Sequence, residues 1–372
     1  MRTEASHSSR EPISRQDHIT SFLISIGIGF IGGTLAFLAS IPMPWLIGAL
    51  AANATWVLAL PGRLNNPVSF PEPLRRGFIV VIAVMIGGTF TPELLNTFPK
   101  WWPSFLTIIG FTVIAQSMAY MVFRRVGGFD RPTAFFSASP GGLVESVILG
   151  EEAGGDARII AMLHFIRLTL IVIVVPFGFT WWVGHSVGSA AGASLTPGPQ
   201  TLAWLDAMLL AIAGIAGFAV ARFFKLPAGV IIGPLLASAA LHIFGVTEGQ
   251  VPNWMGAVAQ VFMGTGIGVR FSGLRRRMLI QGVGLCLITV SLMLGLAMII
   301  AVFLAPLTAT KPEIYMLGFA PAGVIEMSLI ALTLGANPVF VTTHHVVRIF
   351  ACVALMPQIY RLVLAPRNKR NL

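Results

Sequence analysis

The stretch SPGGLVES, residues 139–146, places a proline, two glycines and a glutamate inside a long apolar part of the chain. The stretch APAGVIEM, residues 320–327, is closely similar. Proline lacks the backbone N–H that a continuous helix needs, and glycine adopts backbone angles that other residues avoid. Both stretches are therefore expected to interrupt a helix, and they decide how the helices around them are arranged.

The composition indicates a protein that lies in a membrane. The chain has 372 residues, of which 56% are hydrophobic and only 10% charged, with a mean hydropathy of +0.84. A soluble domain carries roughly 25% charged residues. This much apolar surface excludes a soluble fold and predicts an all-α polytopic membrane protein. Both cysteines, Cys286 and Cys352, lie within apolar runs, which argues against a disulfide framework.

Apolar runs long enough to cross a bilayer occur along most of the chain. A helix needs about 20 apolar residues to span the hydrocarbon core. Runs of that kind lie at 20–40, 43–60, 77–96, 103–123, 157–184, 203–221, 227–246, 254–270, 279–305 and 339–361. Two further stretches, 133–152 and 314–335, are broken by proline and glycine near their starts. They are either full spans or hairpins that enter and leave the membrane on one side.

The basic residues predict which side each loop occupies. With ten full spans, two hairpins and a cytoplasmic N-terminus, 19 of the 24 basic residues fall on the cytoplasmic side, and the outer loops hold only Lys100 and Lys311. An excess of basic residues in cytoplasmic loops is the rule for membrane proteins. We therefore expect a multi-pass membrane protein with both termini in the cytoplasm. A model of twelve spans also keeps both termini inside, but the length lost at each Pro-Gly break favours ten.

The chain contains an internal duplication. At an offset of 181 residues, Pro140, Gly142, Glu145, Gly154, His164, Arg167, Val172 and Pro176 match Pro321, Gly323, Glu326, Gly335, His345, Arg348, Val353 and Pro357. At an offset of 185, residues 41–50 overlay residues 226–235. The predicted segments are a cytoplasmic tail at 1–19, repeats at 20–184 and 203–363, a linker at 185–202 and a second tail at 364–372.

The number of spans in each half decides the symmetry. Five spans is an odd number, so the second half would be inserted upside down relative to the first. Inverted 5+5 repeats with a broken or re-entrant helix in each half are the architecture of many secondary transporters. The alternative of 6+6 spans would make the halves parallel.

The two tandem elements, each followed by a His-x-x-Arg span, resemble the bacterial membrane AbrB family, which is built from an AbrB duplication. The resemblance covers about residues 20 to 363. It implies a multi-pass protein of the bacterial cytoplasmic (inner) membrane, made of two related halves and unrelated to the soluble DNA-binding AbrB protein. The family carries the labels regulator and ammonia monooxygenase. The repeat logic is also similar to that of cation/proton antiporter and anion-transporter folds.

The candidate solute- or ion-binding residues come from the two broken elements and the spans that follow them. They are Pro140, Gly141, Gly142, Glu145, His164, Arg167, Pro321, Gly323, Glu326, His345 and Arg348. A charge at the bilayer centre costs roughly 2.5–3.5 kcal/mol on insertion scales, so a buried carboxylate commonly marks a pathway or a relay. Each His–Arg pair lies on one helix face, because its members are three residues apart.

Two interpretations of these residues stay open. In the first, the arginine holds an anionic group while histidine or glutamate carries protons. In the second, the arginine pairs with the glutamate of its own repeat, and this pair braces the broken helix. Asp156 and Asn337 precede the His–Arg spans, and we expect both to cap them.

The leading hypothesis for function is a secondary transporter of a small polar or charged solute coupled to H⁺ or Na⁺. A membrane regulator that acts on gene expression indirectly is the second. The third is a metal-dependent monooxygenase. The chain has no HxxxH, HxxHH or CxxC pattern, so a metal site would need Glu145, His164, Glu326 and His345 to gather across the repeats. We expect no enzyme activity, no cofactor, no metal and no nucleic-acid partner. The expected partners are the solute, the lipid bilayer and a second copy in a homodimer.

Overall fold

The computed structural model describes residues 15–59, 70–92, 94–187, 202–274, 276–308 and 310–364. All regular secondary structure within these residues is helical, which confirms the expected all-helical chain. Most of the predicted tails and linker fall outside the described residues. The α-helices are α1 (Arg15–Leu38), α2 (Pro44–Ala59), α3 (Glu72–Gly87), α4 (Leu94–Thr97), α5 (Trp102–Met121), α6 (Arg131–Ser137), α7 (Leu143–Glu152), α8 (Ala157–Val183), α9 (Trp204–Phe223), α10 (Gly229–Ile243), α11 (Asn253–Gly268), α12 (Arg276–Thr308), α13 (Pro312–Phe319), α14 (Val324–Thr333) and α15 (Pro338–Ile359).

Four short helical turns extend these helices. They are the 3₁₀ turns η1 (Phe98–Trp101) and η3 (Val269–Phe271) and the π turns η2 (Val122–Val126) and η4 (Tyr360–Leu364).

Six of the described helices are long and apolar enough to cross a membrane, fewer than the ten spans that the hydropathy runs predict. They are Ile19–Leu38, Phe98–Val126, Ala157–Val183, Trp204–Phe223, Arg276–Thr308 and Pro338–Leu364. The helices α2, α3, α10 and α11 have 15 or 16 residues and reach about 24 Å, short of the roughly 30 Å core. The hydropathy pattern overestimates their length because apolar residues continue through the turns at their ends.

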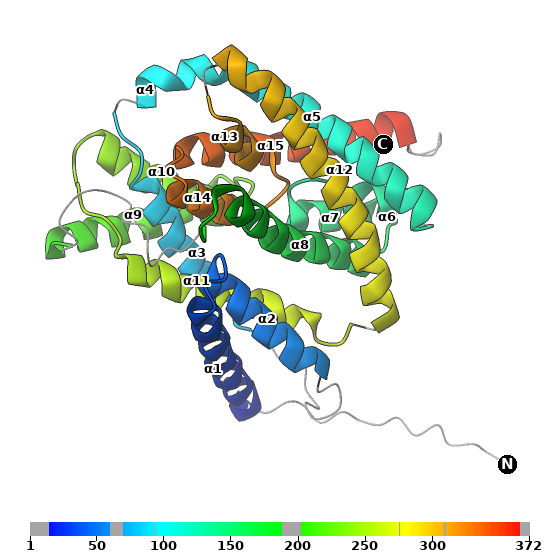
Figure 1. Ribbon diagram of the computed structural model, residues 1–372, viewed down its shortest axis with the longest axis horizontal. Helices are drawn as coiled ribbons and strands as arrows, with labels where there is room; N and C mark the ends of the chain where they lie inside the picture. The colour runs from blue at the N-terminus through cyan, green and yellow to red at the C-terminus, as the bar shows by residue number, and fades with distance from the viewer. Residues whose placement is uncertain are drawn as a thin grey trace.

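The helices form two bundles, and each bundle takes helices from both predicted repeats (Figure 1). We call one the crossed bundle: it contains α1, α2, α3, α9, α10 and α11, with α2 packed on α11 and α3 on α10. The other, the broken-helix bundle, contains α5 to α8 and α12 to α15. Between the bundles, α14 against α3 is the most extensive packing among the described helices.

The turns that lead into α2 and α10 share an unusual backbone. Ser40 and Met43 before α2 have φ of 54° and 46°, and Lys225 and Ala228 before α10 have φ of 51° and 52°. Within the described chain these are the non-glycine residues with positive φ. A side chain in this region costs roughly 1–2 kcal/mol. The two pairs lie 185 residues apart, at the offset that the sequence overlay uses for this region.

The helices that follow these turns, α2 and α10, each cross the preceding helix at a pair of closely packed glycines. A Cβ added at Gly48 of α2 would lie 2.3 Å from the Gly32 carbonyl oxygen of α1. At Gly233 of α10 it would lie 2.1 Å from the Gly217 carbonyl oxygen of α9. Backbone therefore meets backbone at both crossings, as in small-residue packing of membrane helices.

The broken segment between α6 and α8 is a hairpin whose two ends lie together. The Asp156 N–H, just after α7, donates to Thr133 Oγ1 at the start of α6 at 2.8 Å. A Cβ on Gly155 would also lie 3.0 Å from the Thr133 nitrogen. The chain therefore returns to the level at which it entered, as the hairpin alternative predicts.

The second broken segment returns in the same way. The Tyr315 ring at the start of α13 meets the Phe340 ring at the start of α15, with centroids 5.2 Å apart. The two hairpins open at opposite ends of the bundle, because they lie against opposite ends of α15. The second hairpin lies at the start of α15, where Phe340 also contacts Trp101, just before α5. The first hairpin lies at the other end, where Phe135 contacts Tyr360, just after α15. Inverted halves require this arrangement; the duplication itself stays a prediction.

Candidate functional site

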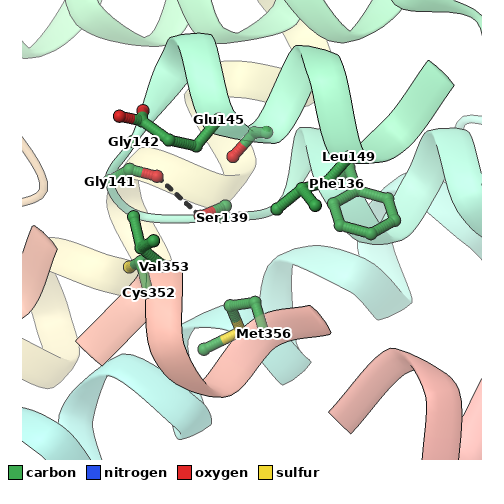
Figure 2. Close-up of a pocket in the computed structure, with 10 residues that line it drawn as sticks. Phe136, Ser139, Gly141, Gly142, Glu145, Leu149, Cys352, Val353 and Met356 are labelled. Carbon is green, nitrogen blue, oxygen red and sulfur yellow. Dashed lines mark hydrogen bonds between the residues drawn. The ribbon is translucent and has the colours of Figure 1, made fainter. Parts of the chain in front are cut away.

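The first break lies between α6 and α7 and depends on one glycine conformation. Gly142 caps α7 with φ of +68°, a left-handed conformation that glycine adopts without strain. Ser139 Oγ donates to the Gly141 carbonyl at 2.7 Å and holds the loop closed (Figure 2). The loop packs on α15, where Cys352 Sγ would lie 3.4 Å from a Cβ on Gly141.

The second break, between α13 and α14, has a different backbone although its sequence is similar. Gly323 has φ of −72°, which any residue can adopt. A Cβ at this position would lie 2.0 Å from Glu326 Oε2, so a larger residue would push the Glu326 carboxylate away from the helix N-terminus. The two Pro-Gly elements therefore interrupt their helices by different local conformations.

Glu145 and Glu326 occupy the same place in their half-helices, the third residue after the capping glycine. Each carboxylate folds back toward that glycine: Glu145 Oε2 would lie 3.3 Å from a Cβ on Gly142, and Glu326 contacts Gly323 as described. The free N–H groups and the positive dipole end of a helix N-terminus favour a negative group. Glu326 is 7% exposed, whereas Glu145 is partly exposed.

Arg348 binds the carbonyl end of the second break. Its Nη1 donates to the Phe319 carbonyl at 3.5 Å and to the Ala320 carbonyl, and its Nη2 donates to the Ala322 carbonyl at 2.8 Å. His345 Nε2 lies 3.0 Å from the Leu317 carbonyl, and its Nδ1 lies 3.0 Å from Arg348 Nη2. The two side chains replace the helical N–H donors that the break removes.

Arg167 and His164 bind the first break less completely. Arg167 Nη1 reaches the Ser137 carbonyl at 3.4 Å, and its Nε, like that of Arg348, has no hydrogen-bond partner. His164 Nδ1 donates to the Ile160 carbonyl at 3.0 Å. Its imidazole lies against the Ser139 backbone, but no hydrogen bond of normal geometry reaches Nε2. The equivalent side chains thus form more hydrogen bonds in the second half than in the first.

The side-chain contacts do not support the second interpretation, in which each arginine pairs with the glutamate of its own repeat. Among the described residues, ion pairs form only between Glu72 and two arginines, Arg75 and Arg270. The physical reason is the polarity of a helix break. The carbonyl end of the first segment attracts the guanidinium, and the N–H end of the next segment attracts the carboxylate. The two charges are therefore drawn to different sides of the gap.

A small cavity of about 10 Å³ lies beside the first break (Figure 2). A cavity needs roughly this volume to hold one water molecule. This cavity therefore has room for about one water molecule. Its lining comes from α6, α7 and α15 and consists of Phe136, Ser139, Gly141, Gly142, Glu145, Ser146, Leu149, Cys352, Val353 and Met356.

The structure brings together some of the eleven predicted residues but not all. Each break collects the proline-glycine loop, the glutamate, the histidine and the arginine of its own half. Glu145, His164, Glu326 and His345 do not gather into one cluster: among the described residues, no group of three or more His, Cys, Asp or Glu side chains could hold a metal ion.

Two polar features escaped the sequence analysis. His344 Nε2 bonds Ser104 Oγ of α5 at 2.8 Å, and its ring stacks on Phe340 with centroids 3.9 Å apart. No spacing within one helix could have paired residues that lie 240 positions apart.

The second feature is the charge cluster around Glu72 at the start of α3. Glu72 accepts from Arg75 Nη2 at 2.9 Å and from Arg270 Nη2 at 2.6 Å. Burial by itself would raise the pKa of Glu72, but the hydrogen bond and charge of Arg75, with a contribution from Arg270, lower it below its usual value. Burial and the nearby Arg75 charge lower the pKa of Arg270.

Comparison with known proteins gives three matches. The family model described as Transition state regulatory protein AbrB matches residues 45–364. A Bacillus subtilis (strain 168) protein named Uncharacterized protein YhjN is 25% identical over 370 residues, covering 94% of this chain and 95% of that protein. An Escherichia coli (strain K12) protein named "Putative regulator AbrB" is 22% identical over 354 residues, covering 95% of this chain and 97% of that protein.

Proposed function

The chain belongs to the AbrB family, whose model matches most of its length, and on this premise we propose that it is a secondary transporter. Its solute is small and polar or charged, and its movement is coupled to H⁺ or Na⁺. The site lies between the two broken helices, and the setting is the bacterial cytoplasmic membrane. The six apolar helices of spanning length support a membrane-associated role.

One observation carries the proposal. Two half-helices begin inside the same bundle, each starts with a glycine, and each presents a glutamate three residues later that no arginine pairs with in the described chain. Half-helix ends at membrane depth are typical binding sites for solutes and coupling ions in secondary transporters. A carboxyl group buried without a cation can reduce its cost by binding a proton or a metal cation.

The two-bundle arrangement supports a mechanism of alternating access. The crossed bundle is held by direct backbone contacts at its glycine crossings, which makes it a rigid support. The broken-helix bundle carries both half-helix ends and meets the crossed bundle chiefly through α14 and α3. Movement of one bundle against the other would expose the site to each side in turn.

If the two hairpins open on opposite sides of the membrane, cysteines placed in them should react with impermeant reagents from opposite sides. After Cys286 and Cys352 are replaced by alanine, single cysteines are introduced at Leu149 near the end of α7 and at Thr333 at the end of α14. With membrane-impermeant thiol reagents, we expect position 149 to react in inverted vesicles and position 333 in intact cells. Reaction of both positions from the same side would contradict the opposed hairpins and the inverted halves.

If Glu145 and Glu326 bind the coupling ion, replacing either carboxylate by a neutral side chain should abolish coupled transport. The purified protein is reconstituted in liposomes loaded with a pH-sensitive dye, and impermeant organic acids, amino acids and Na⁺ are added in turn. We expect a solute-dependent proton movement in the wild type, and a reduction of at least tenfold in Glu145→Gln and in Glu326→Gln. An unchanged thermal midpoint must accompany the loss.

The matched control for these variants is Glu151→Gln, an exposed carboxylate in the last turn of the same hairpin helix as Glu145. It should transport as the wild type does. Unaltered flux in both Glu145→Gln and Glu326→Gln would contradict the proposal.

A regulatory role is a second candidate, and the name of the Escherichia coli relative, "Putative regulator AbrB", favours it. In our view such an effect on gene expression would follow indirectly from solute movement. If supplying the solute rescues the phenotype of a deletion strain, the result favours transport. If a Glu326→Gln protein that no longer transports rescues that phenotype, the result favours regulation.

A further inference from the structure

Polar atoms without a hydrogen-bond partner gather at the first helix break. Within the described chain, four such buried atoms lie here: Gln116 Oε1, Ser137 Oγ, His164 Nε2 and Arg167 Nε. Each of these side chains is at most 2% exposed. They are neighbours, because Gln116 Nε2 donates to the Phe135 carbonyl at 2.6 Å and Arg167 Nη1 to the Ser137 carbonyl, both in α6. Buried polar atoms are normally hydrogen-bonded, so a group of unpaired ones is a candidate binding site.

The second half has smaller, apolar residues at two of these places. At the offset of 181 residues, Gln116 and Ser137 correspond to Ala297 and Gly318. The histidine and the arginine recur, but the polar side chains that surround them do not. A binding function of this cluster therefore concerns the first break and not the second.

Arg167 keeps one edge of its guanidinium free. Its hydrogen bond to the described chain uses Nη1, so Nε and Nη2, which share the other edge, have no partner there. This edge can hold a carboxylate through two parallel N–H bonds. Arg75 uses it in this way, since its Nε and Nη2 donate to one oxygen of Glu72 at 3.1 Å and 2.9 Å. In Arg348 the same edge is occupied, because Nη2 donates to the Ala322 carbonyl at 2.8 Å.

His164 keeps a free acceptor nitrogen. Its Nδ1 donates to the Ile160 carbonyl, so Nδ1 carries the proton of the neutral ring and Nε2 carries a lone pair. A second proton can bind to Nε2 without breaking that hydrogen bond. His345 offers no such position, because its Nε2 donates to the Leu317 carbonyl and its Nδ1 accepts from Arg348 Nη2. The two histidines, equivalent in sequence, therefore differ in their capacity to take a proton.

We propose that the first break binds a carboxylate and a proton together: the free edge of Arg167 holds the carboxylate, and His164 Nε2 takes the proton. The inference rests on the proposed transport function and deepens it, because it names the solute as a small organic acid. The proton comes from the aqueous phase, and the neutral imidazole and the carboxylate become an imidazolium–carboxylate pair. This proton is separate from the ion that the two glutamates are proposed to bind.

The charges explain why the proton and the carboxylate bind together. His164 and Arg167 lie one turn apart on one face of α8, and long side chains of a helix point back toward the preceding turn. An imidazolium would place a second positive charge beside the buried guanidinium, where repulsion is stronger than in water. A carboxylate between the two groups cancels that repulsion. Proton binding and carboxylate binding then strengthen each other by the same factor.

The protein around His164 supplies no carboxylate that could cancel the two charges. Among the described residues, neither His164 nor Arg167 forms an ion pair. The titratable groups around this turn of α8 are Glu145 of α7, Cys286 of α12, Cys352 of α15 and Arg270 of η3. The other charged residues of α6, α7 and α12 lie at exposed helix ends. Glu145 turns toward Gly142 at the N-terminus of its own helix, so the compensating charge has to come from a solute.

The test reads the protonation of His164 directly and requires no movement of solute. The purified protein, with ¹⁵N-labelled histidine, is titrated in detergent with formate, acetate and succinate, against NaCl of equal ionic strength. Nitrogen NMR distinguishes the two neutral tautomers from the imidazolium, and His164→Gln and His345→Gln assign the signals. Without a carboxylate, we expect neutral His164 with its proton on Nδ1 and neutral His345 with its proton on Nε2.

A carboxylate should convert His164 to the imidazolium and leave His345 unchanged. The Kd of the carboxylate, taken from this titration, should fall at least fivefold between about pH 8 and about pH 6, because each bound anion takes up a proton. In Arg167→Gln the carboxylate should no longer change the His164 signal. Arg167→Lys keeps the charge without the planar edge and should weaken binding at least fivefold. The matched control is Arg158→Gln, an exposed arginine of the same helix, which should respond as the wild type does.

Three results would overturn the proposal. If His164 carries a proton on Nε2 without any carboxylate, that nitrogen is not a free acceptor. If none of the three carboxylates changes His164 even at high concentration, the break is not a carboxylate site. If Arg167→Gln responds as strongly as the wild type, another group binds the carboxylate.

These equilibrium measurements are independent of the flux assay. A carboxylate response at His164 in a protein without coupled flux would support the binding site and contradict the transport proposal. Coupled flux that depends on the glutamates, without any carboxylate response at His164, would support transport and overturn this site.

Discussion

Replacement of Arg348 by alanine is expected to destabilise the protein far more than replacement of Arg167. Arg348 is 1% exposed and donates to three backbone carbonyls at the end of α13, whereas Arg167 reaches one carbonyl at 3.4 Å. An unsatisfied buried polar group costs about 1–3 kcal/mol. We expect a loss of ~3–5 kcal/mol for Arg348→Ala and ~1–2 kcal/mol for Arg167→Ala, on the same scale. Thermal unfolding in detergent, followed by tryptophan fluorescence, measures the difference.

Two further variants separate the hydrogen bonds from the charge. Arg348→Lys keeps the charge but lacks the planar fork that bridges several carbonyls, so it should recover only part of the loss. Arg348→Met keeps much of the volume and removes the buried charge. A higher thermal midpoint for Arg348→Met than for the wild type would mean that burial of the charge outweighs its hydrogen bonds, and would contradict the prediction.

Valine at either glycine crossing should be equally damaging in the two halves. In Gly48→Val and Gly233→Val, the added Cβ would lie 2.3 Å and 2.1 Å from a backbone oxygen of the neighbouring helix. Backbone cannot rotate away as a side chain can, so the helices must separate. Overpacking commonly costs about 1–3 kcal/mol, and we expect about 3 kcal/mol or more at each crossing.

The control for the crossings is Gly110→Val in α5, where no heavy atom lies within 4 Å of an added Cβ. Like Gly48→Val and Gly233→Val, this variant replaces a helical glycine by valine, but the added side chain meets no neighbouring helix. It should therefore shift the thermal midpoint little. Fluorescence-detected size-exclusion chromatography after heating gives the ranking. A midpoint for Gly48→Val or Gly233→Val that matches Gly110→Val would show that the crossings do not depend on close backbone contact.

The helix caps and the helix breaks could be predicted from local sequence. Asp156 accepts hydrogen bonds from the backbone N–H groups of residues 158 and 159, and Asn337 accepts from those of 339 and 340, as predicted for N-caps. These contacts span two or three residues, so the pattern of residues along the chain contains all that is needed. The same holds for the all-helical class, which follows from composition, and for the breaks at Gly142 and Gly323.

The partners of the buried charges could not be predicted in this way. The glutamate and the arginine of one repeat carry opposite charges, which suggests that they pair. Arg348 instead binds backbone carbonyls, and Glu326 turns to the N-terminus of its own helix. Charge type is a property of the sequence, but the direction in which a broken helix presents its two dipole ends is a property of its path in space.

Hydropathy, proline and glycine act within a few residues, so the amino-acid pattern alone predicts a helical protein that is apolar enough for a membrane and is interrupted at two related places. Three features become visible only in the folded chain: both interrupted segments fold back as hairpins, α2, α3, α10 and α11 stop short of spanning length, and Glu72 of α3 meets Arg270 from 198 residues away. These outcomes depend on which helix surfaces pack together, and packing between distant segments leaves no periodic mark along the chain.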